Sequence, residues 1–303
     1  MELIVDFSWL WNRSYFAFKD FQNSEGDLTG AMYGVLKFHE AIADKGYKIV
    51  ACLDDISNFR KEVYEDYKAN REVDVERVKA KRCNQSLFEI LSYFGWEFYK
   101  TEGCEADDLI ASRAMENAKA GNPCVVYSSD KDLQQIMIFP SVQVASSIEQ
   151  GQFVYKTEQD TIEKLGCSPS QIRYFRPFKG DTSDNIPSAV SRIQSKHLIP
   201  IAKDIEDGLV LGLTLENAYD KAILKNKSSL TPSALQKLME GRETYVRNFI
   251  IMDLIKWYHN PIPQNKVEFR TLTETGLFEL LDKYELKEFK GNYIDNLAVR
   301  GLL

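Results

Sequence analysis

Short apolar runs alternate with longer amphipathic segments along the first half of the chain. Each run is rich in β-branched and aromatic residues and gives way to polar or acidic positions, which is typical of strands buried on both faces of a sheet. Because such strands alternate with helical segments, the pattern predicts an α/β fold with a central, mostly parallel sheet flanked by helices. The runs lie at residues 2–6, 49–53, 96–99, 124–127 and 142–148.

Helices are predicted where apolar residues recur every three or four positions. Residues 31–43 and 105–119 show this spacing, and Gly46 and Pro123 lie just beyond their ends. From about residue 156 the chain becomes more helical and less regularly patterned. Helices are expected there at residues 172–178, 193–205, 233–238 and 245–257.

Three of the predicted strands are followed by aspartates, namely Asp6, Asp54 and Asp130. A single acid at a strand end is usually a turn residue. Three acids on strands of one parallel sheet are harder to explain in this way, because the carboxyl ends of parallel strands meet at one edge, where α/β proteins bind ligands. We therefore expect these three side chains to converge.

A second acidic group, Glu105, Asp107 and Asp108, opens the helix predicted at 105–119. Two carboxylates about 4 Å apart repel by roughly 4 kcal/mol at an effective dielectric near 20, so acids gathered at a sheet edge require compensation. A hard cation such as Mg²⁺ or Mn²⁺, which takes oxygen ligands, provides it. Acids also favour helix N-termini because of the macrodipole, and this cluster taken alone fits both interpretations equally.

Composition narrows the class of protein. The 303 residues are 44% hydrophobic and 27% charged, as in ordinary globular proteins. The five cysteines are odd in number and never form a CxxC pair, which favours a reducing, cytoplasmic location over disulfides or structural zinc. Glu2 stands where a signal peptide has basic residues, and no apolar run approaches the roughly 20 residues of a membrane span, so no membrane association is expected.

Charge gives a mixed indication about partners. The net charge of −7 argues mildly against nucleic acid, although acids that hold divalent ions would no longer repel it. Only three histidines are present, none in a recognisable triad motif, so histidine-based nucleophilic catalysis is disfavoured. Residues 60–82 have a net positive charge, opposite in sign to that of the whole chain, with eight basic and six acidic side chains. This polar stretch is predicted to be either a solvated helix pair or a mobile segment that grips the substrate.

Seven motifs, in order, resemble those of the flap-endonuclease-like 5′ nucleases, in particular the bacterial polymerase-associated and bacteriophage members. The match is dense from residue 1 to about residue 187. A single EADD or DKD motif is weak support, whereas the ordered set is specific. The motifs are IVDFSW (4–9), AMYGVLKF (31–38), FRKEVYEDYKANR (59–71), EADDLIAS (105–112), SSDKDL (128–133), KGDTSDNIP (179–187) and RNFIIMDL (247–254).

The resemblance implies a nuclease that uses two Mg²⁺ ions, for which Mn²⁺ would substitute. All nine acidic positions of the family carry an acid in this chain. The resemblance assigns the first ion to Asp6, Asp54, Glu105, Asp107 and Asp108, and the second to Asp130, Asp132, Asp181 and Asp184. It makes Lys68 and Arg71 the catalytic basic residues, whose positive charges would stabilise the charge that develops on the phosphate. DNA contacts are expected from Tyr67, by stacking on a base, and from Arg60, Lys79, Lys81 and Arg82.

The resemblance also divides the chain. Residues 1–155 are expected to form a PIN-like, or resolvase-like, α/β core that carries a helical arch at about 58–95. Residues 156–303 are expected to form a helical DNA-binding region with a helix-hairpin-helix variant at about 179–205.

That hairpin departs from the family, because Ser188, Arg192 and Gln194 stand where glycines are expected. Glycine lets the backbone approach a phosphate closely, so its loss puts K⁺ binding at this hairpin in doubt. Side chains of Ser188, Arg192 and Lys196 would then contact the duplex instead.

Together these observations predict a divalent-metal-dependent 5′ nuclease that hydrolyses phosphodiesters at 5′ ends, flaps or nicks of DNA, and of RNA primers in RNA–DNA hybrids, in phage-type replication or repair. We expect a monomer that acts beside a separate replication protein. Two alternatives stay open, a PIN-like ribonuclease and a catalytically silent nucleic-acid-binding scaffold of the same fold. The long insertion and the KGDTSDNIP element disfavour the ribonuclease, and the complete set of acids disfavours the scaffold.

Overall fold

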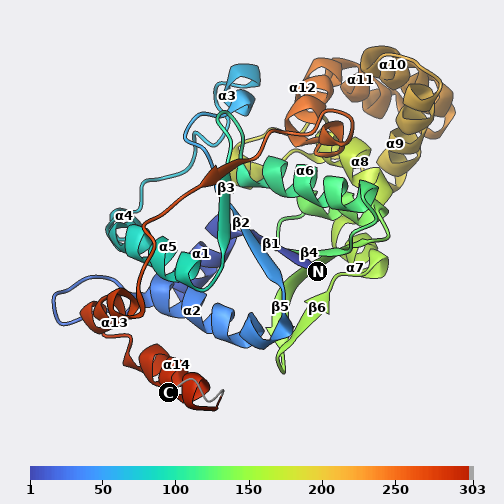
Figure 1. The fold of residues 1–303 in the computed structure, drawn as a ribbon. Coiled ribbons are helices and arrows are strands. Elements are labelled where there is room, and N and C mark those ends of the chain that lie inside the picture. Colours follow the sequence, from blue (N-terminus) through green and yellow to red (C-terminus); the bar gives the residue numbers. More distant parts are fainter. Residues whose placement is uncertain (300–303) are drawn as a thin grey trace.

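A computed structural model describes residues 1–299 of the chain. It contains a seven-stranded sheet in the order β6-β5-β4-β1-β2-β3-β7 (Figure 1). The inner strands pair in parallel and the two edge strands pair antiparallel to them, which confirms the mostly parallel sheet. The strands are β1 (Glu2–Asp6), β2 (Lys48–Cys52), β3 (Glu97–Lys100), β4 (Cys124–Tyr127), β5 (Val142–Glu149), β6 (Gln152–Tyr155) and β7 (Asn265–Val267).

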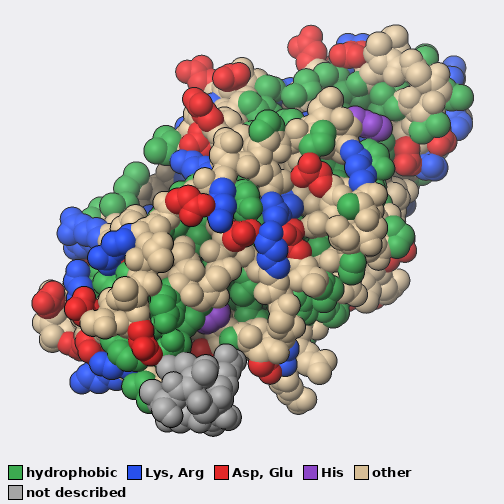
Figure 2. All heavy atoms as spheres, in the orientation of Figure 1, with side chains coloured by type: hydrophobic (Ala, Val, Ile, Leu, Met, Phe, Trp, Pro, Cys, Tyr) green, Lys and Arg blue, Asp and Glu red, His purple; other side chains and the backbone are tan. Residues whose placement is uncertain are grey.

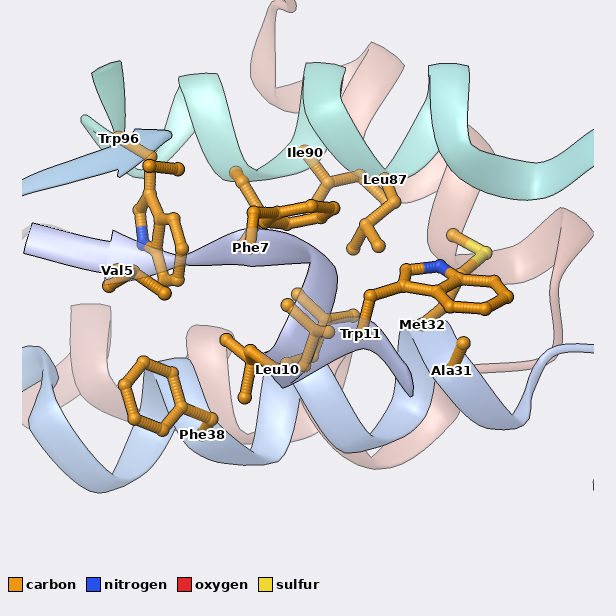
Figure 3. Packing of buried hydrophobic residues seen from close by; sticks show 14 of the residues in the cluster. Val5, Phe7, Leu10, Trp11, Ala31, Met32, Phe38, Leu87, Ile90 and Trp96 are labelled. Carbon is orange, nitrogen blue, oxygen red and sulfur yellow. The ribbon is translucent and has the colours of Figure 1, made fainter. Parts of the chain in front are cut away.

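Helices cover both faces of the sheet because successive strand residues point to opposite sides. On β1, Leu3 and Val5 belong to one core cluster and Ile4 to the other. The first cluster lies under α1 (Phe7–Ala17), α2 (Gly30–Ile42) and α5 (Asn84–Tyr93), and the second lies under α6 (Ala106–Lys119). Figure 3 shows side chains of α1, α2 and α5 meeting in the first of these clusters.

The predicted arch region divides into two parts. Its last helix, α5, belongs to the core, because Leu87, Ile90 and Leu91 are fully buried against the sheet. The arch itself is therefore shorter than the range 58–95 that we expected. It consists of α3 (Phe59–Val63), a stretch of turns, and α4 (Val75–Ala80).

A group of helices with its own hydrophobic core follows β6. Phe178, Tyr219 and Tyr245 pack together at its centre. Between α8 and α9 the chain forms an irregular loop, in the place where the helix-hairpin-helix variant was expected. The helices are α7 (Glu158–Leu165), α8 (Ile172–Lys179), α9 (Ser195–Val210), α10 (Leu215–Asn226), α11 (Pro232–Glu240) and α12 (Arg242–Met252).

The last part of the chain packs against the α/β core formed by the first half. β7 pairs with β3, and Leu277 and Leu281 of α13 (Glu274–Lys283) are buried in the cluster that α5 covers. α14 (Lys287–Val299) follows, and Figure 1 shows α13 and α14 near α2 and far from α8 to α12. The helical region expected at 156–303 thus includes a strand and helices that complete the core, and its last four residues lie outside the described ones. None of the helices in residues 1–299 combines the length and hydrophobicity needed to cross a membrane.

Candidate metal centre

Eight carboxylates line one pocket at the carboxyl edge of the sheet. β1 lies between β2 and β4, so the acids that end or follow these three strands are brought together. The helix N-terminus of α6 and the loop after α8 supply the others. The pocket has a volume of about 190 Å³, and its acids are Asp6, Asp54, Glu105, Asp107, Asp130, Asp132, Asp181 and Asp184.

Asp6 is fixed by two hydrogen bonds at the junction of β1 and α1. It caps α1 by accepting from the backbone N–H of Trp9 at 2.9 Å, and it accepts from the Ser128 hydroxyl at 2.8 Å. Burial, with a further contribution from the charge of Asp54, raises its pKa to about 6. The carboxylate is therefore fixed in position, but its surroundings offset little of its negative charge.

Asp107 and Asp130 are also buried carboxylates that lie near other negative charges. Burial raises the pKa of Asp107 well above its ordinary value, and the charges of Asp130 and Asp6 raise it further. Burial and the neighbouring Asp132 raise the pKa of Asp130 to about 7. Among the described residues, no side chain or backbone group donates a hydrogen bond to Asp107. An unpaired carboxylate between other carboxylates favours a bound cation.

The donor set fits a hard divalent cation, because the charged oxygens in the pocket belong to Asp and Glu and none of the described histidines or cysteines lines it. Within residues 1–299, however, no three acidic, histidine or cysteine side chains close around one point. The acids line the walls of an open pocket, and several are paired with bases. Figure 2 shows acidic and basic side chains side by side in the middle of the visible face.

Both bases that the resemblance assigned to catalysis line this pocket. The Lys68 ammonium lies 2.5 Å from a Glu105 oxygen and 3.9 Å from Asp184, and the Arg71 guanidinium lies 2.6 Å from Asp184. They come from the turns between α3 and α4 and reach the acids across the pocket. In this arrangement the bases supply the positive charge that the carboxylates require.

The segment 64–71 is clamped onto the loop 181–186. The backbone N–H of Lys68 donates to the Asp184 carbonyl at 2.9 Å, and the Asn70 and Asn185 side chains donate across the junction at 2.9 and 2.8 Å. Gly180 begins the loop with φ +65°, and a Cβ there would lie 2.4 Å from the Ile186 carbonyl oxygen. The loop therefore folds tightly, which presents both Asp181 and Asp184 to the pocket.

Asp108 is the one expected metal ligand that does not line the pocket. Its carboxylate is fully buried and accepts two hydrogen bonds from Arg60, at 2.5 and 2.9 Å, and one from the Trp257 indole at 2.9 Å. Burial alone would raise its pKa, but Arg60 holds it below the ordinary value. Asp107 and Asp108 point apart because neighbouring residues differ by about 100° around a helix.

Arg60 and Tyr67 require correction as DNA contacts, because both side chains are interior. The Arg60 guanidinium is 4% exposed and is held by Asp108 and the Ile251 carbonyl. Tyr67 is 2% exposed, and its hydroxyl lies 2.9 Å from Glu105 and 3.2 Å from Asp184. Its ring packs in a small apolar cluster with Ile186, Ile251 and Met252, so it has no free face for a base.

The other expected DNA contacts lie outside the pocket and remain predictions. Lys79, Lys81 and Arg82 are exposed on and after α4, where Figure 2 shows basic side chains gathered at the left edge of the view. In the loop between α8 and α9, the Ser188 hydroxyl donates to backbone carbonyls and Arg192 is exposed, whereas Lys196 is exposed on the first turn of α9. Arg192 has φ +60°, so the backbone keeps a left-handed residue there without a glycine.

Arg176 is a site residue that sequence reasoning missed. It lies on α8, is 8% exposed, and bridges Asp132 at 3.0 Å and Asp181 at 2.6 Å. Although Asp181 is partly buried, which alone would raise its pKa, hydrogen bonds from Ser183 and Arg176 hold that pKa at about 2. An arginine on the apolar side of a short, strongly amphipathic helix is the sequence signal that would have indicated a paired, interior charge.

The mostly parallel sheet, the acidic pocket at its carboxyl edge and the clamped arch define an α/β protein with a candidate site for divalent ions. The chain belongs to the 5′-3′ exonuclease family, whose N-terminal resolvase-like domain matches residues 1–166.

Named relatives and solved structures agree with this family. The chain is 34% identical over 189 residues to a 5′-3′ exonuclease of Buchnera aphidicola (61% of this chain, 64% of the relative) and 33% identical over 286 residues to a thermostable DNA polymerase I of Thermus thermophilus (93% and 32%). It thus spans less than two thirds of these relatives. The 5′-exonuclease of bacteriophage T5, solved with divalent zinc, has the same fold, with a TM-score of 0.60, 18% identity, and 93% and 97% of the chains covered.

Proposed function

We propose that this protein is a divalent-metal-dependent 5′ nuclease that hydrolyses phosphodiesters at 5′ ends or 5′ flaps of DNA. The observation that carries the proposal is the convergence of eight carboxylates on one pocket, three of them with raised pKa values, in a chain of the 5′-3′ exonuclease family. The names of its relatives support the reaction, since they include 5′-3′ exonucleases and DNA polymerase I. A T5 flap endonuclease of the same fold was solved with DNA and metal ions.

The metals in this proposal are two Mg²⁺ ions, with Mn²⁺ as a substitute. Asp6, Asp54, Glu105 and Asp107 would hold one ion, and Asp130, Asp132, Asp181 and Asp184 the other. When bound, such ions supply activation of water and stabilisation of the leaving oxygen.

Protein side chains would orient the phosphate between these acids. Lys68 and Arg71 would exchange their carboxylate partners for phosphate oxygens when substrate enters, since both side chains already line the pocket. Lysine provides a compact charge and arginine a planar fork, so the two hold the phosphate in different ways. The apolar walls formed by Ile186, Ile251 and Leu254 would limit water at the reacting bond.

Duplex DNA would be held by the loop between α8 and α9 together with the first turn of α9. In our proposal this contact uses the side chains of Arg192 and Lys196 rather than K⁺. The Lys237 ammonium lies 3.4 Å from the Ser191 carbonyl, so a protein cation already faces the loop backbone. Salt dependence tests this point, because replacement of Arg192 should reduce the slope of log affinity against log salt by about 1.

We further propose that the protein acts as a cytoplasmic monomer, that RNA primers in hybrids are also substrates, and that a separate replication protein is its partner. A substrate panel of flap, nick, gap, blunt end, single strand and RNA–DNA hybrid would define the preference.

The direct test uses purified protein, Mg²⁺ and a 5′-labelled flap, with Asp107→Asn as the matched inactive variant. We expect metal-dependent release of label by the wild type and a loss of at least about 100-fold in the variant. Absence of cleavage of every DNA substrate would reject the proposal. Cleavage of RNA alone would instead support the PIN-like ribonuclease, and binding without cleavage would support the silent scaffold.

A further inference from the structure

Only two aromatic side chains line the pocket in the part of the chain that the structure describes, Tyr67 and Trp9. Tyr67 is buried and cannot stack on a base as expected, so another residue would have to make that contact. Trp9 lies on the first turn of α1 and is partly exposed. Its backbone N–H donates to the Asp6 carboxylate at 2.9 Å, which ties its position to an acid of the site.

The indole N–H groups of the four tryptophans are not equivalent. Trp11 donates to Asn84 at 2.7 Å, Trp96 to His39 at 3.2 Å and Trp257 to Asp108 at 2.9 Å. Among residues 1–299, the Trp9 indole N–H has no acceptor, and it is not a buried atom. Trp9 is thus the tryptophan whose polar edge is left available to a ligand.

The Trp9 ring is held in place before any ligand arrives. The Tyr127 ring packs against it at 5.0 Å in an edge arrangement, and the Arg13 guanidinium lies 5.5 Å from its centroid. Arg13 is itself fixed, because it donates to the Tyr127 hydroxyl and to the Ser146 carbonyl, both at 2.9 Å. A fixed aromatic ring loses little entropy on stacking.

We propose that Trp9 stacks on the base of the nucleotide next to the cleaved phosphodiester and thereby positions that bond over Asp6. The proposal rests on the proposed function, since it concerns the substrate of the same pocket. Every base presents a π face, so stacking tolerates any sequence while it fixes the distance from base to phosphate. Trp9 is a substrate-binding and positioning residue here, and the acids remain the reactive centre.

Binding is tested with a flap oligonucleotide that carries a nonhydrolysable linkage at the cleavage position, in the presence of Mg²⁺. Three proteins are compared: the wild type, Trp9→Phe, which keeps an aromatic face, and Trp9→Leu, which keeps only apolar volume. We expect the oligonucleotide to quench tryptophan fluorescence in the wild type and not in either variant. Trp9→Leu should bind about 5- to 150-fold more weakly, and Trp9→Phe should recover most of this loss.

A substrate with an abasic site next to the cleaved bond separates stacking from other contacts. If Trp9 stacks on that base, the defect of Trp9→Leu disappears with the abasic substrate, because no base is left to stack. An equal defect on both substrates would overturn the stacking proposal and assign the indole to the sugar-phosphate backbone. Unchanged binding and quenching in Trp9→Leu would remove the residue from the site altogether. Wild-type cleavage of the normal flap, measured alongside, keeps these outcomes distinct from failure of the nuclease proposal.

Discussion

At the scale of single residues, basic side chains balance part of the negative charge of the carboxylates that line the pocket. Lys68, Arg71 and Arg176 each pair with acids that line it. These basic side chains pair with carboxylates in the structure, and the same side chains can also bind phosphate oxygens. In the proposed mechanism, bound ions would compete with these basic side chains for the carboxylates, and phosphate oxygens would compete with the carboxylates for the basic side chains.

Lys68→Ala should lower the single-turnover cleavage rate by roughly 100-fold or more, because a charge aimed at the reacting phosphate is worth most in the transition state. DNA binding should weaken by less than about tenfold, since one exposed phosphate contact contributes little to affinity. Rates and equilibrium binding are measured on the same flap. Lys45→Ala, on the surface and paired with Asp44, serves as the control that should change neither. Equal losses of rate and binding would reduce Lys68 to a simple substrate contact.

The raised carboxyl pKa values make stability depend on pH. Asp6 and Asp130 hold their protons to about pH 6 and 7 in the folded state, whereas in the unfolded chain they release them near pH 4. The folded state thus binds more protons in this range, and stability is lost as pH rises from about 4 through 7. We expect the melting temperature in EDTA to fall across this window.

Mg²⁺ should restore the melting temperature more at pH 8 than at pH 5, because the acids are charged and free to bind only at the higher pH. Asp107→Asn should flatten the dependence in EDTA and reduce the Mg²⁺ effect. A melting temperature in EDTA that rises between pH 5 and 7 would contradict the assignment of these shifts.

At the scale of elements, local patterning predicted the strands well where they are buried. The run at residues 124–127 coincides with β4, because four apolar residues between polar turns leave few alternatives. Helix α1 was missed, since it begins at Phe7 directly after β1 and no turn separates the two patterns. The edge strands β6 and β7 were missed because they are short and largely exposed.

The interior positions of Arg60 and Tyr67 depend on long-range packing that local patterns do not encode. Their neighbours Ile251 and Met252 lie on α12, far along the chain, and nothing near residue 60 indicates that contact. Asp6, Asp54 and Asp130 were predictable for the opposite reason, because each ends or follows a strand of the sheet. Asp181 and Asp184 lie in the loop after α8 and were assigned by the family resemblance.

The contact between segment 64–71 and loop 181–186 can be tested by removing one of its hydrogen bonds. Asn185 has φ +57°, so Asn185→Gly keeps the backbone conformation and removes only the hydrogen bond to Asp66. We expect hydrogen exchange of amides in 64–71 to accelerate about fivefold, as for the loss of about 1 kcal/mol. Gln150→Gly, at another left-handed position in the β5–β6 turn, is the matched control. Unchanged exchange in 64–71 would show that the other clamp contacts suffice.

At the scale of the whole molecule, the pocket joins the sheet to the helical region. Asp6, Asp107 and Asp130 come from the core, whereas Asp181 and Asp184 come from the loop after α8. Arg176 crosses this junction, because it binds Asp132 on one side and Asp181 on the other. The two parts are therefore held together by the same charges that form the site.

Arg176→Met should destabilise the protein by about 3 kcal/mol in EDTA, since removing one partner of a buried ion pair leaves uncompensated carboxylates. Urea unfolding measures the loss, and Arg242→Met is the control, because its exposed pair with Asp220 should contribute less than about 1 kcal/mol. Mg²⁺ should recover part of the loss in Arg176→Met only, as a bound cation replaces the missing charge between Asp132 and Asp181. If Mg²⁺ stabilises the variant no more than the wild type, the ions bind elsewhere and the junction is held by packing alone.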